Sequence, residues 1–579
     1  MFLFKSDLKR VFKGDIDDSE DAIKTYSRDA SLLEVFPQVV VYPRDAEDIK
    51  NLVIWVNQKN IQINDDSHRL FITPRSAGTC MAGGAIGESI VVDFMRYMNT
   101  IESVNIVTPF AITPKFPNAN PVEISGEASV MPGVYYRDFE PKTFEKGLLL
   151  PCYTASKSLN ALGGMIGNNS AGEKTLGYGK TEDYIKELSV VFSDGREYKV
   201  APLTKKELYA KIAQGDFEGN IYKDIFAIIN DNKDEIKNAK PAVSKNSAGY
   251  YIWNVWDAEK EIFDLTKLIV GSQGTLGIVT HMKLHLVKVK PASKLVAVFM
   301  KDLTNLGGIV GQILTHKPES LESYDDATMK LAIKFFPDFL KKKGPWGMLK
   351  FMFSFLPEAG LMAWKGFPKL VLLVEFAGEN EKEIDQKARD LVKDISSFGF
   401  GMRVTSSQAE SEKYWDIRRE SFALLRKHVK DLHTAPFIDD IIVKPELLPE
   451  FLPKLRAILD QYPITYTIAG HAGNGNFHII PLMDFREKKT ADIILELSDK
   501  VYDLVFQYKG STTAEHNDGI IRAPFLKQMY GEKIYSIFEN TKNVFDVKNI
   551  FNPGKKVGAT KDYIRAHIVQ EGHEHSHKI

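Results

Sequence analysis

The N-terminal part of the chain combines short apolar runs with one amphipathic stretch. The run VVVYP at 39–43 is rich in β-branched residues and ends at a proline, which is typical of a strand. Asp45 then precedes apolar residues that recur at helical spacing through 49–56, so Asp45 is the predicted helix cap. Two further apolar runs, at 69–74 and 89–94, have the length of strands. The pattern predicts a small α/β unit.

A different rhythm begins after His285, where strand-like and helix-like stretches alternate. The runs at 294–300 and 369–378 are strongly apolar, whereas 381–395 has the spacing of an amphipathic helix. A second predicted helix carries Trp415 and Arg418. The change of rhythm indicates a separate domain, which we expect to bind the substrate.

Length and composition predict a folded protein of more than one domain. The chain has 579 residues, whereas a single core stops growing at about 250 to 300. Its 44% hydrophobic and 26% charged residues are ordinary globular values. We expect an N-terminal segment at 1–32, a first domain at 33–290, a second domain at 291–510 and a C-terminal segment at 511–579.

Charge and cysteine content exclude several classes of protein. The formal net charge is −1, so no overall field favours nucleic acid. Cys80 and Cys152 are the two cysteines, too few for a disulfide framework, a four-cysteine zinc site or an iron–sulfur cluster. The start of the sequence lacks a signal-peptide pattern, and no window has the roughly 18 uninterrupted apolar residues that would span a bilayer. We expect a cytoplasmic protein.

Three stretches rich in glycine and other small residues lie beside predicted strands. They are at 75–84, 156–179 and 271–280. Such loops let backbone N–H groups surround an anion such as a pyrophosphate. None fits the Rossmann fingerprint or the phosphate-binding P-loop, and one alone would be read as a tight turn. The three together indicate an extended ligand of dinucleotide size.

Histidines and a carboxylate gather at two places late in the chain. Two apolar strands within 463–483 flank a loop that holds His471 and His478, and Glu515 stands beside His516 further on. Two imidazoles and a carboxylate are enough to hold a catalytic divalent metal that keeps an open position. The alternative is that these histidines cap turns and satisfy backbone groups.

Several motifs, taken in order, resemble a known family. They are TYSRDAS (25–31), PRSAGT (74–79), LGGMIGNNSAG (162–172), GSQGTLGI (271–278), HAGNGNFH (471–478) and EHNDG (515–519). Over residues 26–557 the chain resembles the FAD-linked oxidoreductases with a flavin domain of the vanillyl-alcohol-oxidase type, in the branch of D-lactate, glycolate and D-2-hydroxyglutarate dehydrogenases. The resemblance implies an α+β fold, with a PCMH-type FAD-binding domain of two α/β subdomains. An α+β substrate or cap domain and a C-terminal helical segment that contacts FAD would follow.

The resemblance implies FAD as the dinucleotide, held by the three glycine-rich stretches. The implied contacts are Pro74, Arg75, Ser76, Ala77, Gly78, Thr79, Ser156, Gly163, Gly164, Asn168, Gly172, Gly274, Thr275, Gly277 and Ile278. Members that bind the flavin covalently often carry a histidine at the position of Thr79, and Cys152 lies farther from Gly163 than the linking cysteine of other members. We therefore expect noncovalent FAD.

The same resemblance gives roles to the late motifs. His471, His478 and Glu515 match residues that bind zinc or a similar divalent metal. His516 matches the base and Arg418 the arginine that binds the substrate carboxylate. The implied reaction is FAD-dependent oxidation of a D-2-hydroxy acid to the 2-oxo acid, with hydride to flavin N5. EHNDG replaces the commoner EHGxG pattern, which leaves the substrate less defined.

Relatives pass electrons to a quinone, a flavoprotein carrier or an iron–sulfur protein, so the resemblance implies such a partner. Residues 334–369 mix aromatic side chains with lysines, which is typical of core with a solvated face or of a segment on anionic lipid. A peripheral position on the inner face of a membrane is thus an alternative to a cytoplasmic one, and a homodimer is compatible. We read the tail histidines His573, His575 and His577 as part of a disordered terminus.

Two other functions stay open at this point. One is a noncatalytic FAD-binding subunit for electron transfer, although such subunits lack the metal-binding histidines. The other is a transferase like alkyl-glycerone-phosphate synthase, whose histidine-rich and tyrosine-containing active-site signature is not visible in this sequence.

Overall fold

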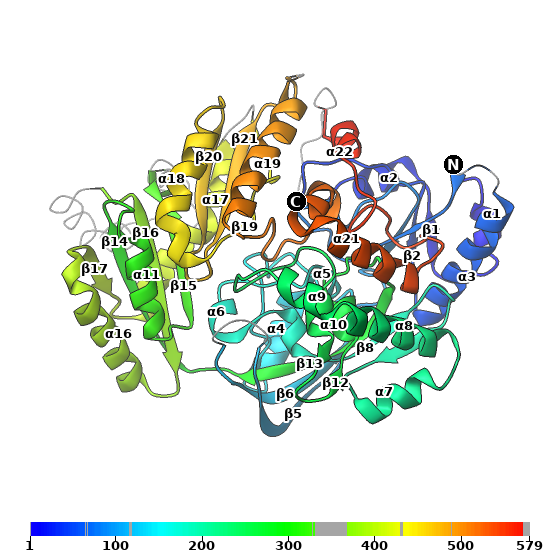
Figure 1. Ribbon diagram of the computed structural model, residues 1–579, viewed down its shortest axis with the longest axis horizontal. Helices are drawn as coiled ribbons and strands as arrows, with labels where there is room; N and C mark the ends of the chain where they lie inside the picture. Colours follow the sequence, from blue (N-terminus) through cyan, green and yellow to red (C-terminus); the bar gives the residue numbers. More distant parts are fainter. Residues whose placement is uncertain are drawn as a thin grey trace.

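The computed structural model describes residues 2–63, 65, 68–114, 119–326, 328–330, 367–428, 432–487 and 489–570. These form an N-terminal lobe (2–290) and a cap lobe (291–510), and a C-terminal segment (511–570) returns to the N-terminal lobe (Figure 1). Helices and strands are mixed in both lobes, which confirms the predicted α+β class.

A four-stranded sheet opens the N-terminal lobe and confirms the predicted α/β unit. Its strands, in the order β1-β2-β4-β3, are β1 (Asp15–Asp17), β2 (Val39–Tyr42), β4 (Ile90–Asp93) and β3 (Ile72–Arg75). Strand β4 runs parallel to β2 and β3, so α3 (Ala46–Gln62) makes the crossover. The Asp45 side chain accepts a hydrogen bond from the backbone N–H of Asp48 and caps α3 as expected.

A larger antiparallel sheet forms the second half of this lobe. Its main strands are β5 (Ile101–Ile112), β6 (Val122–Val130), β13 (Ile278–Lys288), β8 (Ile185–Val191) and β9 (Glu197–Val200), in that order. Helices pack around it: α4 (Tyr136–Phe144), α7 (Lys205–Ile212), α8 (Phe217–Asp231), α9 (Lys233–Ala239) and α10 (Thr266–Ile269). Large buried side chains such as Tyr136, Phe139 and Tyr222 fill the core.

The cap lobe is built on one eight-stranded sheet (Figure 1). Its strands are β17 (Gly401–Val404), β14 (Ala292–Met300), β16 (Leu370–Gly378), β15 (Ser320–Asp325), β20 (Thr465–His471), β21 (Asn476–Met483) and β18 (His433–Thr434), in that order, with β19 (Ile441–Ile442) beside β21. Helices α11 (Leu306–Thr315), α16 (Glu381–Ile395), α18 (Leu448–Leu459) and α19 (Thr490–Gln507) contribute to one core with it. Ile468 and Ile479 point into that core, so the side chains that alternate with them face the N-terminal lobe. Helix α17 (Gln408–His428) packs on this second face through Tyr414 and Trp415.

The C-terminal segment carries α20 (Gly519–Arg522), α21 (Leu526–Phe545) and α22 (Lys561–His567). Phe551 pairs with Ile72 beside the first sheet. The side chain of Asn552 donates to the carbonyl oxygens of Gly84 at 2.9 Å and Gln273 at 2.7 Å. The end of the described chain therefore completes the lobe in which the chain begins.

The second glycine-rich stretch differs from the loop that its composition suggested. It contains the helices α5 (Leu162–Asn168) and α6 (Thr175–Tyr178). Leu162, Met165 and Ile166 are buried at helical spacing. Their packing outweighs the low helix propensity of the intervening Gly163 and Gly164.

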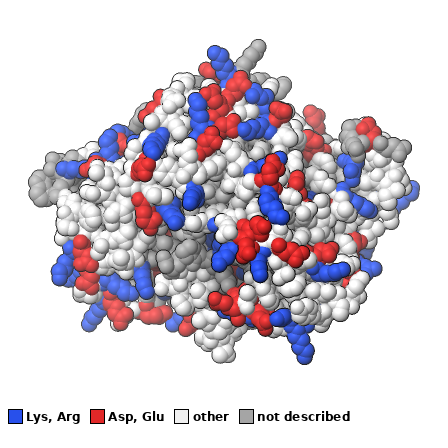
Figure 2. Space-filling model, viewed as in Figure 1, with Lys and Arg blue, Asp and Glu red and all other residues white. Residues whose placement is uncertain are grey.

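Within the described residues, no helix is long and apolar enough to cross a membrane. The stretch 334–369, for which core with a solvated face and a position on lipid were both considered, falls outside the described residues except for 367–369, and the histidines of the tail also fall outside. Acidic and basic side chains are interspersed over the face drawn in Figure 2, in keeping with the net charge of −1.

Candidate active site

A cavity of about 1090 Å³ lies where the two lobes and the C-terminal segment meet. The predicted residues that line it are Pro74, Arg75, Ser76, Ala77, Gly78, Thr79, Ser156, Gly163, Gly164, Asn168, Gly274, Gly277, Arg418, His471, His478, Glu515 and His516. The structure thus brings the glycine-rich stretches and the histidine motifs to one space. Three predicted cofactor residues, Gly172, Thr275 and Ile278, are not part of the lining.

Each of these three residues has a structural contact instead. A Cβ on Gly172 would lie 2.0 Å from the carbonyl oxygen of Tyr153, so glycine is needed for close backbone packing. The Thr275 hydroxyl lies 2.7 Å from the Tyr250 hydroxyl, and Ile278 is buried in the core of the first sheet.

Gln273 connects the glycine-rich stretches to each other. Its side-chain oxygen accepts the backbone N–H of Gly519 at 2.8 Å, and its amide donates to Asn168 Oδ1 at 3.0 Å. Its backbone φ is +53°, a left-handed conformation held by these contacts. Gln273 therefore holds the walls of the cavity together.

The walls fit a flavin dinucleotide. A Cβ on Gly163 would lie 2.6 Å from Ser76 Oγ, and one on Gly274 would lie 2.2 Å from Pro74 Cγ, so both glycines allow loops to approach closely. Gly164 also lines the cavity, and a Cβ added to it would meet no described atom within 4 Å, so the space beside it is open to a ligand. The volume stands at the upper end of ordinary ligand pockets, as a dinucleotide requires.

The hairpin of β20 and β21 brings His471 and His478 together. The register pairs Ala469 with His478 and His471 with Asn476. Both histidines therefore lie on the same face as diagonal neighbours, and their ring centroids are 5.3 Å apart. The turn between them is a short 3₁₀ segment, Ala472–Asn474, followed by Gly475 at φ +73°. The two histidines lie close together as predicted, but they belong to the strands β20 and β21 and not to the connecting loop, so the strand register brings them together.

Three imidazoles face one oxygen of Glu515. The Nε2 atoms of His471, His478 and His516 lie 3.1, 3.3 and 3.8 Å from Glu515 Oε1. Glu515 and His471 are almost fully buried, whereas His478 and His516 are partly open to the cavity. Coordinating atoms that converge in this way can hold a divalent cation.

The opposite ring nitrogens of these histidines all meet acceptors. His471 Nδ1 lies 2.5 Å from Glu322 Oε1, and His478 Nδ1 lies 2.9 Å from the Asp439 carbonyl oxygen. His516 Nδ1 lies 2.8 Å from Asp439 Oδ2. Each acceptor favours a proton on Nδ1 and leaves Nε2 as the lone-pair donor, which is the arrangement that metal-binding histidines use. The residues present thus fit a metal.

Asp440 belongs to the same cluster but has another task. Within the described chain, one group of ligand atoms lies within 4.8 Å of one another, and it comprises Asp440, His478, Glu515 and His516. Asp440 Oδ2 already accepts the backbone N–H groups of residues 514, 515 and 516 and the Thr513 hydroxyl, and Oδ1 accepts Asn476 Nδ2. A carboxylate with five donors is a poor ligand but a firm support for the loop that carries Glu515.

The charges in this cluster shift several pKa values. Burial opposes the ionised form of Glu515, yet Lys245 and His471 hold its pKa well below the usual range. Burial likewise opposes a charged His516, but Asp439 and Asp440 outweigh it and raise the pKa of His516 to about 9. A divalent cation beside Glu515 would repel the imidazolium and lower that value.

Three arginines in or near the site have different surroundings. Arg418 lines the cavity and pairs at 2.5 Å with Glu322, the carboxylate that also holds His471. Arg419 pairs with Glu173, and Arg522 forms a fully buried pair with Asp439.

Sequence reasoning missed four buried residues of this site: Lys245, Glu322, Asp439 and Asp440. One signal was present for two of them, because FIDDII places adjacent aspartates inside an apolar run, where unpaired charge is costly. Lys245 and Glu322 carry no such local signal.

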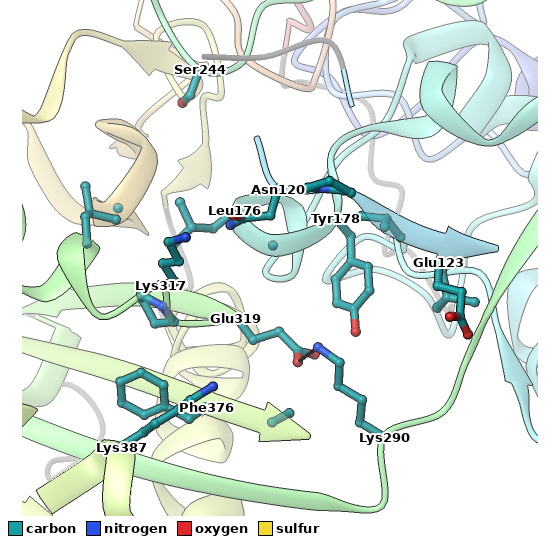
Figure 3. A pocket seen from close by; sticks show the side chains of 18 of the residues that line it. Asn120, Glu123, Leu176, Tyr178, Ser244, Lys290, Lys317, Glu319, Phe376 and Lys387 are labelled. Carbon is teal, nitrogen blue, oxygen red and sulfur yellow. Dashed lines mark hydrogen bonds and ion pairs between the residues drawn. The ribbon is translucent and has the colours of Figure 1, made fainter. Parts of the chain in front are cut away.

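A second cavity, of about 1100 Å³, lies between the lobes (Figure 3). None of the predicted site residues lines it. Figure 3 shows Lys290 extending toward Glu319, and their charged groups are 2.9 Å apart. The α6 residues Leu176 and Tyr178 contribute to its wall, while the preceding Glu173 lines the first cavity. The stretch at 173–178 therefore separates the two spaces.

Two family models match this chain. The model described as FAD binding domain matches residues 37–201, and the model described as FAD linked oxidases, C-terminal domain matches residues 289–556. The first range includes two of the glycine-rich stretches that line the cavity. The second range includes Arg418 and the imidazole cluster, which consists of His471, His478 and His516 around Glu515.

Named relatives extend the match along the chain. The D-2-hydroxyglutarate dehydrogenase of Pseudomonas putida is 26% identical over 548 residues, which cover 94% of this chain and 50% of that protein. The glycolate oxidase subunit GlcD of Bacillus subtilis is also 26% identical, and the match covers 93% of each chain. This chain therefore spans about half the length of the first relative.

The fold itself has solved counterparts. The structure of 4-ethylphenol oxidase from Gulosibacter chungangensis aligns with a TM-score of 0.63 at 13% identity, over 96% of this chain and 97% of that one. At this identity the likeness concerns the arrangement of the backbone alone.

Proposed function

This chain belongs to the FAD-linked oxidoreductases, and we propose that it oxidises a D-2-hydroxy acid to the corresponding 2-oxo acid. One observation carries the proposal: a single cavity is lined by the predicted flavin loops, by Arg418 and by the imidazole cluster. The named relatives support this class of substrate, because they are described as D-2-hydroxyglutarate dehydrogenase and a glycolate oxidase subunit.

The side chains divide the chemistry between them. The guanidinium of Arg418 binds the substrate carboxylate and fixes C2 in the cavity. Nε2 of His516 takes the hydroxyl proton, while Asp439 holds the opposite ring nitrogen at 2.8 Å. The C2–H bond breaks with its electron pair as the C–O bond becomes a carbonyl. FAD bound noncovalently at the glycine-rich walls would supply the acceptor for that hydride.

We propose that the metal held by His471, His478 and Glu515 is zinc. Imidazole and carboxylate ligands suit Zn²⁺, and three protein ligands leave a position for substrate. Such a cation would polarise the substrate hydroxyl and favour its deprotonation. Metal analysis of the purified protein tests the identity: one equivalent of zinc is expected, and another stoichiometric metal would replace that assignment.

Anaerobic reduction of the bound flavin tests the proposed reaction. D- and L-lactate, glycolate, and D- and L-2-hydroxyglutarate are mixed with the protein, and the flavin absorbance near 450 nm is followed. We expect bleaching by one or more D-acids or glycolate, loss of bleaching after chelation, and recovery when zinc is restored.

The other outcomes separate the components of this proposal. Bleaching that survives complete metal removal would contradict the metal's role but keep the oxidation. A yellow protein that none of the acids reduces would favour a noncatalytic flavin subunit. A protein that takes up no FAD would overturn the proposed function altogether.

A further inference from the structure

Lys245 is a fully buried lysine whose charge is directed at the candidate metal ligand. It lies in the N-terminal lobe between α9 and the 3₁₀ helix Ile252–Asn254. Its Nζ is 2.8 Å from Glu515 Oε2 and 3.4 Å from Asn476 Oδ1. No motif in the sequence singled it out.

The neighbours of Lys245 fix its backbone against both metal-bearing loops. Ser244 Oγ donates to the carbonyl oxygen of Asn474 at 3.2 Å, in the turn between the two hairpin histidines. Ser247 Oγ donates to the carbonyl oxygen of Ala514 at 3.0 Å, directly before Glu515. This stretch, which we call the 244–247 strap, therefore enters from the N-terminal lobe and ties the hairpin to the C-terminal segment.

The two oxygens of Glu515 consequently have different partners. Oε1 faces the three imidazole Nε2 atoms at 3.1 to 3.8 Å, and Oε2 faces Lys245. A buried carboxylate whose second oxygen lost its partner would turn toward other donors or incur a large desolvation cost. The lysine thus determines which oxygen is presented to the imidazoles.

We propose that Lys245 is a positioning residue of the metal site, holding Oε2 of Glu515 so that Oε1 remains the oxygen presented to the metal. The inference rests on the proposed function, because it assumes that His471, His478 and Glu515 bind a divalent cation.

A purely electrostatic role and a positioning role of Lys245 predict opposite effects of its substitution on metal affinity. Removing a positive charge from beside a divalent cation would by itself tighten metal binding. Losing the partner of Oε2 would loosen it, by about 10- to 100-fold if Lys245 behaves like other residues that support metal ligands. The direction of the change therefore separates a positioning role from a purely electrostatic one.

The test is the zinc dissociation constant of the full-length, FAD-loaded protein, measured by competition with a chromophoric chelator. We expect Lys245→Met to raise the constant by about 10- to 100-fold and Lys245→Arg, which keeps donor and charge, to restore it to within a few fold. Flavin absorbance and the melting temperature report whether each variant is folded. An unchanged or tighter constant in a folded Lys245→Met protein would overturn the proposal.

Lys180→Met is the matched control. Lys180 is also buried, and its Nζ donates to the carbonyl oxygen of Asn246 at 2.7 Å without touching a metal ligand. We expect Lys180→Met to leave the zinc dissociation constant unchanged. If Lys180→Met weakened zinc binding as much as Lys245→Met does, the weakening would come from a general loosening of the 244–247 strap. If Lys245→Met does not fold, Lys245→Leu, which also lacks a donor, replaces it, and a wild-type constant there would also overturn the proposal. A wild-type protein without zinc affinity would overturn the metal site of the proposed function itself.

Discussion

At the scale of single residues, Asp439 organises more of the site than any predicted residue. Its carbonyl oxygen orients His478, and its carboxylate orients His516 while pairing with the buried Arg522. One residue thereby fixes a candidate ligand and the candidate base relative to each other. The base depends on Asp439 for its tautomer, because a proton held on Nδ1 leaves Nε2 to accept the substrate proton.

Replacing His516 separates proton transfer from cofactor binding. His516→Ala removes the proposed base, so we expect the flavin reduction rate to fall by about 10²- to 10⁴-fold. FAD and zinc content should stay at wild-type levels, because His516 is the imidazole farthest from Glu515 Oε1. Stopped-flow absorbance and metal analysis measure both.

His68→Ala, at an exposed histidine whose ring contacts Asp65, serves as the control and should leave the rate unchanged. A wild-type rate in His516→Ala would show that another group takes the proton.

At the scale of elements, the alternation of side chains along the β20–β21 hairpin places two candidate metal ligands, His471 and His478, on one face. Thr467, Ala469 and His471 alternate with residues of the cap core, and His478 and Ile480 continue the same face on the partner strand. The geometry depends on the turn, where Gly475 has φ +73° and a Cβ would lie 1.9 Å from the carbonyl oxygen of Val443. Neither the backbone conformation nor the space permits a larger residue.

Gly475→Ala should therefore damage the hairpin while sparing the flavin walls. We expect loss of bound metal and a melting temperature lower by several degrees, with FAD still bound, as measured by metal analysis and thermal unfolding. Gly311→Ala is the control, because Gly311 lies in the middle of α11 and no described atom lies within 4 Å of an added Cβ. Gly311→Ala should leave the melting temperature unchanged or raise it, since alanine favours a helix more than glycine does. Wild-type metal content in Gly475→Ala would contradict the strained-turn argument.

These elements also show how much of the site could be predicted from the sequence. The apolar runs on either side of HAGNGNFH were enough to predict two strands whose connection brings His471 and His478 together, although both histidines were placed in the loop and not on the strands. The helix α5 was missed because its two glycines disfavour a helix, and only packing against the rest of the lobe stabilises it. Glu322 and Lys245 could not be found, since they reach His471 and Glu515 across 149 and 270 residues of sequence. Local sequence patterns do not indicate contacts between residues that are so far apart in the chain.

At the scale of the whole molecule, ion pairs connect the lobes beside the stretch that separates the two cavities. Glu173 and Lys174 are adjacent in the N-terminal lobe, and they pair with Arg419 and Glu319 of the cap lobe. Glu375 lies within this group, 3.9 Å from Lys174. Burial, together with the charges of Glu319 and Glu173, raises the pKa of Glu375 to about 7 in spite of Lys174 and Arg419.

This shift predicts a pH-dependent difference between the wild type and Glu375→Gln. The unfolded carboxyl titrates near 4.5 and the folded one near 7, so the folded state binds the extra proton between these values. The stability that Glu375 contributes is therefore present at pH 4.5 and below and is lost as the pH rises to 7. The glutamine variant, which cannot ionise, should match the wild type at pH 5 and exceed its unfolding free energy by about 2 to 3 kcal/mol at pH 8.

Denaturant unfolding at the two pH values measures the difference. Glu259→Gln, at an exposed position, should show none at either pH. A Glu375→Gln protein whose advantage is the same at pH 5 and pH 8 would contradict the raised pKa.

The return of the C-terminal segment to the N-terminal lobe has a consequence for synthesis of the protein. The side chain of Asn552 closes onto the carbonyl oxygen of Gly84 across 468 residues. At ribosomal rates of about 5 to 20 residues per second, the loop around Gly84 waits roughly 20 to 90 seconds before its partner emerges. Once residue 280 has been made, the nascent chain has all three glycine-rich stretches but still lacks the residue that ties two of them together. Flavin should therefore be captured late, after translation has passed Asn552.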